Sequence, residues 1–224
     1  MNKSKKQILI NLLVICLYFI WPYFLNSITS LLGISSVVSL YMSFSVNFIF
    51  LFIIIYIYRK ILGNNYNNLL KNFKDKIFDC IKIFFIGLIC YIFFNFLFEI
   101  FKIPFLSNQD SMGEMMRLIP VMFVLNTIFY YPVIEELVFK MSLKEIIKNK
   151  WSFIIITGLL NAFFQIVFSM TRATDLLYLL PYAIFFGSLS YIYYKTNNIM
   201  YPIILRVCYN LIPCIIYIVD LVQM

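Results

Sequence analysis

Long apolar stretches dominate the chain and alternate with short polar segments. Windows of about 20 apolar residues recur along it, and this length suits an α-helix that crosses about 30 Å of hydrocarbon. The windows are 8–26, 37–58, 81–101, 118–134, 151–170, 176–194 and 199–219. The pattern predicts an all-α polytopic bundle of about seven membrane helices, with kinks at the prolines of the last two windows.

The composition indicates an integral membrane protein. Of the 224 residues, 63% are hydrophobic and 12% are charged, about half the charged fraction of an average soluble domain. A soluble domain of this size could not bury so much apolar surface. We expect one transmembrane domain over 1–224, with N-terminal helices and an amphipathic loop in 1–116 and a core in 117–219.

Lysine and arginine gather in alternate loops. With seven crossings, 14 of the 18 Lys and Arg residues fall on one side and three on the other, while Arg206 lies inside the last window. The positive-inside rule then places the N-terminus in the cytoplasm of a multi-pass protein. The same asymmetry accounts for the net charge of +8, so we expect no nucleic-acid partner.

The loop between the second and third windows carries apolar residues at helical spacing among lysines. These residues are Leu69, Leu70, Phe73 and Ile77. The spacing predicts an amphipathic helix on anionic membrane lipid. A protein-binding surface is the alternative interpretation.

Histidine is absent from the sequence. This excludes a Ser-His-Asp triad, a Cys-His pair and every zinc site that needs histidine. The five cysteines lie in or beside apolar runs without a C-x-x-C, as small buried hydrophobic residues do. We therefore expect neither a cofactor nor a metal.

Ionisable residues within apolar windows are costly, and they mark candidate sites. Glu135 and Glu136 follow Pro132, which predicts a kink or break in the helix just before them. Adjacent residues of an α-helix point about 100° apart. We expect Glu136 to turn away from the bundle interior and pair with Lys140, four residues on, while Glu135 faces that interior. Alternatively, both glutamates are ordinary loop charges.

A polar stripe runs along the fifth window. Thr157, Asn161, Gln165 and Ser169 are each four residues apart, so they share one face of a helix. Hydrogen bonding between helices is the plain structural interpretation of such a stripe.

The last window adds Arg206 and Asn210, again four residues apart. An arginine inside a membrane needs an acceptor, and Glu135 or Glu136 lies at a matching depth. The three groups of polar residues together predict one internal cavity that opens toward the cytoplasm.

The order and spacing of these residues resemble the motifs of the CPBP family, the CAAX-processing and bacteriocin-processing intramembrane proteases. Its motif E-E-x-x-x-R stands here as EELVFK, with Lys140 in place of arginine. Its F-x-x-x-H corresponds to NAFFQ, with Asn161 and Gln165 in the two motif positions. Its H-x-x-x-N corresponds to RVCYN, with Arg206 in the histidine position and Asn210 as the match.

The resemblance covers about 120–216 and implies roles for its residues. In the family the first glutamate activates the attacking water, so Glu135 would be the base, with Glu136 and Lys140 as a structural pair. Asn210 would donate to the oxyanion.

The two replaced histidines bear directly on the implied chemistry. Gln165 can orient a water but cannot exchange a proton near neutral pH. Arg206 can donate to an oxyanion, or it can hold Glu135 in a salt bridge that makes the carboxylate a poorer base. Asn161 and Thr157 would support the site from the second motif's helix.

The sequence therefore predicts a CPBP-type glutamate endopeptidase scaffold in a bacterial cell membrane, with lost or altered proteolysis. It would act on or bind a membrane peptide or a partner protein, for example in bacteriocin immunity. An active, divergent CAAX-type endopeptidase is the main alternative. A small transport subunit is a lesser one, because the helix-breaking prolines cluster in one half of the chain. The oligomeric state is left open.

Overall fold

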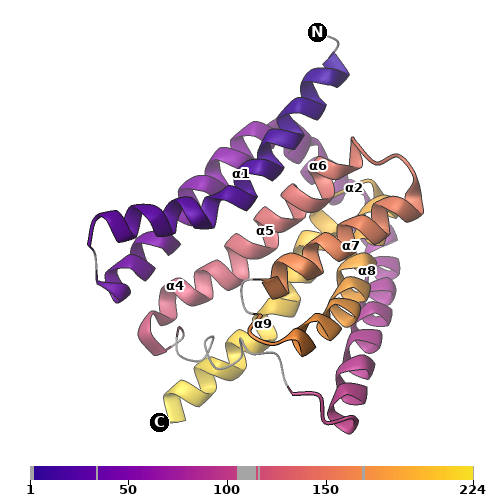
Figure 1. Ribbon diagram of the computed structural model, residues 1–224. Helices are drawn as coiled ribbons and strands as arrows, with labels where there is room; N and C mark the ends of the chain where they lie inside the picture. Colours follow the sequence, from indigo (N-terminus) through magenta and orange to yellow (C-terminus); the bar gives the residue numbers. More distant parts are fainter. Residues whose placement is uncertain (1–2, 34, 105–114, 116, 168–169, 224) are drawn as a thin grey trace. The chain divides into compact units, whose positions relative to one another are not determined.

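The computed structural model describes residues 3–33, 35–104, 115, 117–167 and 170–223. These residues form helices joined by short connections and include no strand (Figure 1). The α-helices are α1 (Lys3–Leu31), α2 (Ser36–Ile100), α4 (Pro120–Leu125), α5 (Tyr131–Glu135), α6 (Ser142–Lys144), α7 (Lys150–Val167), α8 (Leu179–Thr196) and α9 (Met200–Gln223). Two π-helical turns, η1 (Asn126–Tyr130) and η2 (Glu136–Met141), and one 3₁₀ turn, η3 (Ala173–Tyr178), lie between them.

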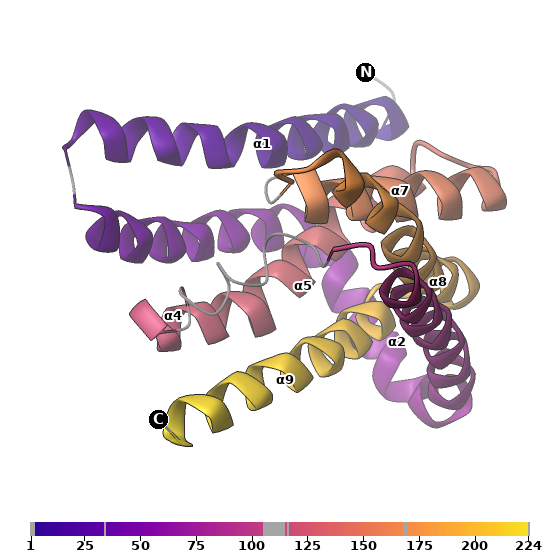
Figure 2. The same ribbon diagram turned by 60° about the horizontal axis from the view of Figure 1, so that its bottom comes forward.

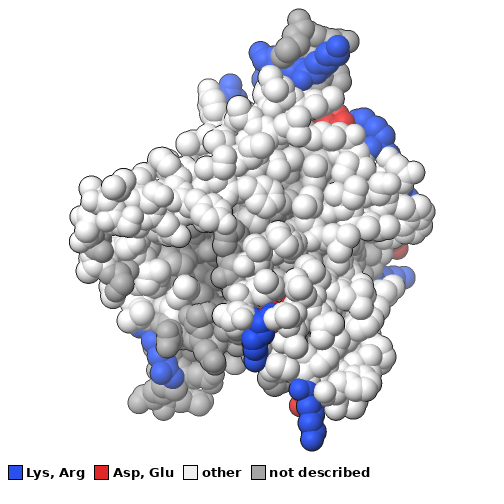
Figure 3. Space-filling model, in the orientation of Figure 1, with Lys and Arg blue, Asp and Glu red and all other residues white. Residues whose placement is uncertain are grey.

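Among the described residues, five helical stretches are long and apolar enough to cross a membrane. Many large apolar side chains on them are exposed, among them Phe52 and Ile86, as lipid-facing side chains are. The surface visible in Figure 3 is correspondingly mostly uncharged. The predicted all-α polytopic fold is confirmed. The seven crossings and the cytoplasmic N-terminus remain predictions.

Two of the predicted windows lie in the single helix α2. Its apolar stretch Val37–Ile100 has 64 residues, about three times the number that crosses a bilayer, and it consists of two helical stretches that meet at Asn72. The amphipathic helix predicted within the intervening loop is therefore helical as expected, but it is part of α2, with no loop on either side. Asn72 departs from helical geometry (φ −117°, ψ 17°) and marks a kink within it.

The chain divides into two compact units, each assembled from separate parts of the sequence. Unit 1 comprises Met1–Lys60, Gly113–Ile146 and Arg206–Met224, and unit 2 comprises Ile61–Met112 and Ile147–Leu205. The division falls within α2 and within α9.

In unit 1, α1 and the first part of α2 run side by side (Figures 1 and 2). Trp21 of α1 stacks on Phe50 of α2 with ring centroids 4.5 Å apart, and its Nε1 donates to Asn47 Oδ1 at 3.0 Å. Asn47 Nδ2 donates in turn to Asn126 Oδ1 of η1 at 3.4 Å. These contacts tie the run from α4 to α6 to the first two helices.

In unit 2, α7 and α8 pack closely because Gly158 has no side chain. A Cβ at Gly158 would lie 2.8 Å from the Ala183 carbonyl oxygen of α8. Close beside this crossing, Thr157 Oγ1 donates to Ser190 Oγ at 2.8 Å. Small residues at a helix crossing with a hydroxyl pair beside it are a common way of joining membrane helices.

Candidate functional site

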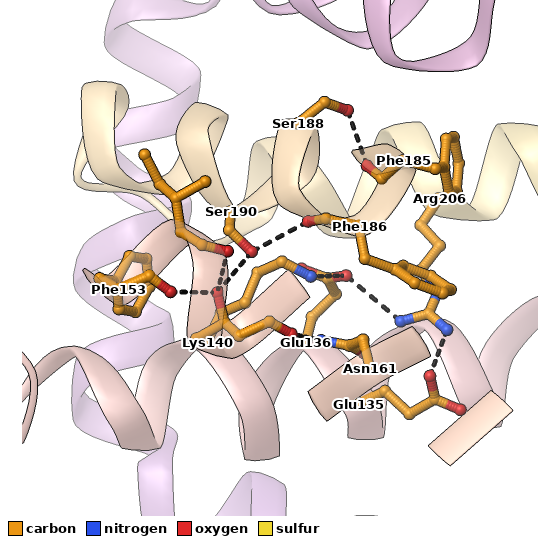
Figure 4. A network of polar contacts seen from close by, with 12 residues as sticks. Glu135, Glu136, Lys140, Phe153, Asn161, Phe185, Phe186, Ser188, Ser190 and Arg206 are labelled. Carbon is orange, nitrogen blue, oxygen red and sulfur yellow. Dashed lines mark hydrogen bonds and ion pairs between the residues drawn. The ribbon is translucent and has the colours of Figure 1, made fainter. Parts of the chain in front are cut away.

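Four charged side chains are buried together in unit 1. Glu135, Glu136, Lys140 and Arg206 are each at most 3% exposed. The first three come from the run α5–η2, and Arg206 comes from α9 (Figure 4). Because both glutamates are buried, they are not ordinary loop charges. We call these four residues the charged cluster.

The charged cluster is held together by three ion pairs. Lys140 Nζ lies 2.5 Å from Glu136 Oε1, and Arg206 Nη1 lies 3.3 Å from the same oxygen. Arg206 Nη2 donates to Glu135 Oε2. Two carboxylates and two cations give the cluster a net charge of zero, so burial leaves no uncompensated charge.

These contacts confirm two predicted pairs, Glu136 with Lys140 and Arg206 with a glutamate. The expectation that Glu136 turns away from Arg206 is wrong, because Arg206 contacts both carboxylates. A π turn begins at Glu136. Successive residues in this wider turn rotate by less than the 100° of an α-helix, which helps both carboxylates to face one guanidinium.

The two oxygens of Glu136 have different environments. Oε1 receives both cations, whereas Oε2 is buried and has no hydrogen-bond partner among the described residues. An unsatisfied buried acceptor is uncommon and is a frequent mark of a functional position. Glu136 Oε2 is thus a buried acceptor for which the described residues supply no donor.

Aromatic side chains surround Glu135. Tyr18, Tyr130 and Tyr131 all lie near its carboxylate. Tyr18 packs edge-on against Phe139 with centroids 5.5 Å apart, and Tyr130 packs against Tyr131 at 5.1 Å. This aromatic wall keeps the surroundings of the ion pairs apolar, and charges attract more strongly in such surroundings than in water.

The π turn η1 explains where Asn210 points. In an α-helix the Tyr131 N–H would donate to the Thr127 carbonyl, but here it donates to the Asn126 carbonyl. The next residue, Pro132, has no N–H. Neither residue therefore donates to the Thr127 carbonyl, and Asn210 Nδ2 of α9 donates to it instead at 2.7 Å. Asn210 thus fixes α9 to the helix that carries Glu135.

We expect Asn210→Ala to lower the free energy of unfolding by about 1–3 kcal/mol, since the Thr127 carbonyl would lose its donor. Unfolding of the purified chain in mixed detergent micelles would measure it. Asn95→Ala is the matched control, because Asn95 Nδ2 donates to the Tyr91 carbonyl at 2.8 Å within an intact helix. An equal loss in both variants would contradict this role for Asn210.

The polar stripe of the second motif lies in unit 2. Thr157 and Asn161 are buried, and Asn161 Nδ2 donates to the Thr157 carbonyl at 3.0 Å. Gln165 is half-buried on the same helix, and Ser169 lies outside the described residues. The predicted cavity shared by these residues and the charged cluster remains a prediction.

Sequence reasoning missed a polar group in unit 1 that supports the charged cluster. Tyr58 of α2 bonds through its hydroxyl to Asn11 Oδ1 at 3.0 Å and Ser142 Oγ at 2.8 Å. Asn11 Nδ2 also donates to the Ser142 carbonyl at 3.0 Å. These bonds anchor Ser142, the first residue of α6 and two residues after Lys140, to α1 and α2. The polar side chains of Asn11 and Tyr58 inside the first two apolar windows could have indicated this group, because polar residues within membrane helices commonly bond to other helices.

The second half of the chain is similar to a known protein family. Residues 117–212 match the family model described as Type II CAAX prenyl endopeptidase Rce1-like. Neither the curated proteins nor the solved structures include a significant match. The matched stretch contains the charged cluster, Asn210 and the polar stripe. Residues 117–212, less than half of the chain, are therefore similar to the Rce1-like CAAX prenyl endopeptidases of the CPBP family.

Proposed function

We propose that this chain is a CAAX-type intramembrane protease scaffold that has lost proteolysis and binds a membrane peptide or partner protein. The observation that carries the proposal is the position of Arg206. It stands where the family motif has histidine, and its guanidinium contacts both glutamates. We propose that the protein lies in a bacterial cell membrane. Bacteriocin immunity is one process in which it would act there.

Proton transfer is the step that this arrangement opposes. A base must accept a proton from water, but a carboxylate beside an arginine is stabilised in its charged form and becomes a weaker base. The guanidinium of Arg206 stays protonated and cannot relay a proton in place of imidazole. Gln165 in the other histidine position has no proton to exchange near neutral pH.

Peptide binding, unlike proteolysis, does not require these residues to transfer a proton. The charged cluster is neutral and held from several helices of unit 1, so a bound peptide need not displace a charge. Glu136 Oε2 supplies an acceptor for a peptide N–H. A membrane-embedded peptide can meet such an acceptor without first losing a strong interaction with water.

An active, divergent endopeptidase is the second candidate. The retained Glu135 and Asn210 favour it, as does the ability of Arg206 to donate to an oxyanion once a substrate separates it from Glu135. The two candidates differ in whether the unmodified chain breaks a peptide bond.

The test uses the full chain in lipid nanodiscs with a library of membrane-anchored peptides, prenylated C-terminal cysteine peptides included. Mass spectrometry reads both cleavage and retention on the immobilised protein. We expect retention without cleavage, and cleavage only after Gln165→His with Arg206→His. Cleavage by the unmodified chain that disappears in Glu135→Gln would establish the active enzyme instead. If the unmodified chain neither retains nor cleaves any peptide of the library, the binding part of the proposal is contradicted.

A further inference from the structure

A band of exposed side chains follows α2 in unit 2, over residues 64–74, and we call it the α2 band. Tyr66 is 53% exposed and Leu70 is 63% exposed. Lys71 and Lys74 are exposed among these apolar residues. Interleaved apolar and basic side chains are what an interfacial helix presents to acyl chains and headgroups.

A shallow pocket of about 210 Å³ lies on the same band. Its lining consists of four asparagines, Asn64, Asn65, Asn68 and Asn197. Asn64, Asn68 and Lys71 are spaced four and three residues apart, so they share one face of the helix. Carboxamide N–H groups donate to phosphate and glycerol oxygens, and the lysine adds a positive charge.

Side-chain and backbone hydrogen bonds hold this pocket in shape. Asn65 Oδ1 accepts from the Ile199 N–H at 3.0 Å, and the Asn65 carbonyl accepts from Asn198 Nδ2 at 2.7 Å. At the kink, the Asn72 carbonyl accepts from the Tyr201 hydroxyl at 3.1 Å. The band is thus fixed to the start of α9, and a ligand would meet a preorganised surface.

The charge around the band favours an anionic partner. Residues 61–82 contain four lysines and two aspartates. One of these, Asp79, pairs with Lys195 of α8 at 2.7 Å, so the surrounding excess is positive. Each lysine near an anionic bilayer surface strengthens the attraction to it.

We propose that the α2 band and its asparagine-lined pocket bind an anionic glycerophospholipid. The pocket takes the phosphate and glycerol of the headgroup, Lys71 and Lys74 balance its charge, and the acyl chains pass around the helix to cover Tyr66 and Leu70 on its other face. Those two exposed apolar side chains favour a lipid over a soluble phosphate, because acyl chains remove them from water. This lipid site is separate in its residues from the charged cluster and goes beyond the proposed function.

The experiment places a bimane fluorophore on Leu70→Cys of the full chain. Three native cysteines are replaced by alanine in this background, namely Cys16, Cys90 and Cys208. The protein is reconstituted in vesicles in which either phosphatidylglycerol or phosphatidylcholine carries bromine, at equal total composition. We expect stronger quenching by the brominated phosphatidylglycerol, and a preference that falls as salt is raised.

Two variants and one control separate the contributions. Lys71→Gln with Lys74→Gln should lower the preference by at least about fivefold, the effect of one surface lysine, and Asn64→Ala with Asn68→Ala should also lower it. Lys5→Gln with Lys6→Gln changes the net charge equally and should leave it intact. Circular dichroism checks that each variant folds.

Three results would overturn the proposal. Equal quenching by the two lipids in the unmodified band would show no headgroup preference. Absence of quenching by either lipid would mean that another protein surface covers the band. Full competition by soluble glycerol 3-phosphate at matched concentration would assign the pocket to a soluble anion.

Discussion

Replacing Arg206 by methionine is expected to lower the free energy of unfolding by about 3–5 kcal/mol, the usual loss when one partner of a buried ion pair is removed. Arg206 contacts both Glu135 and Glu136, and all three are at most 3% exposed. Its loss would leave two carboxylates buried with Lys140 as their single cation. Equilibrium unfolding in mixed micelles, followed by circular dichroism, would measure the change.

The paired variant Glu135→Gln with Arg206→Met distinguishes a buried charge from lost packing. Removing one carboxylate together with its cation returns the charged cluster to a net charge of zero. Such paired replacements are often neutral or stabilising, so we expect much of the lost stability to return. A double variant as unstable as Arg206→Met alone would show that Arg206 acts through packing.

Lys140→Met should lower the free energy of unfolding by about 3 kcal/mol, near the lower end of the range for a broken buried pair. Glu136 Oε1 would lose its contact at 2.5 Å but keep Arg206 Nη1 at 3.3 Å. Lys60→Met, at an exposed position of α2, is the control and should change stability by less than about 0.5 kcal/mol. Similar losses in both variants would contradict a special role for Lys140.

The pairing within the charged cluster could be predicted from two features of the sequence: the four-residue spacing of a glutamate and a lysine, and the free-energy cost of an unpaired charge in an apolar window. Glu136 and Lys140 are one turn apart on a helix, and Arg206 inside an apolar window has to find an acceptor. The same reasoning could not give the direction of Asn210. That direction depends on which carbonyl the π turn and Pro132 leave without an N–H donor, and this is a property of the folded backbone.

The extent of α2 was the main departure from the predicted fold. A change in polarity after Tyr58 suggested a loop, but polarity alone does not end a helix. No proline occurs between Pro22 and Pro104, and the spacing of Leu69 and Phe73 remains helical. With no strong breaker the helix continues, and it yields only at the Asn72 kink.

The π turn ahead of Glu135 also makes chain length a determinant of the site. A π turn holds one residue more than an α turn, because its hydrogen bonds run from i to i+5. Deleting a single residue from Asn126–Tyr130 would restore an ordinary α turn and leave Glu135 close to its present face, because the π turn already accommodates the additional residue. A deletion within the regular helix α5 would instead rotate Glu135 by about 100°, away from the face that Arg206 contacts. The site therefore tolerates a change of chain length in η1 that it would not tolerate in α5.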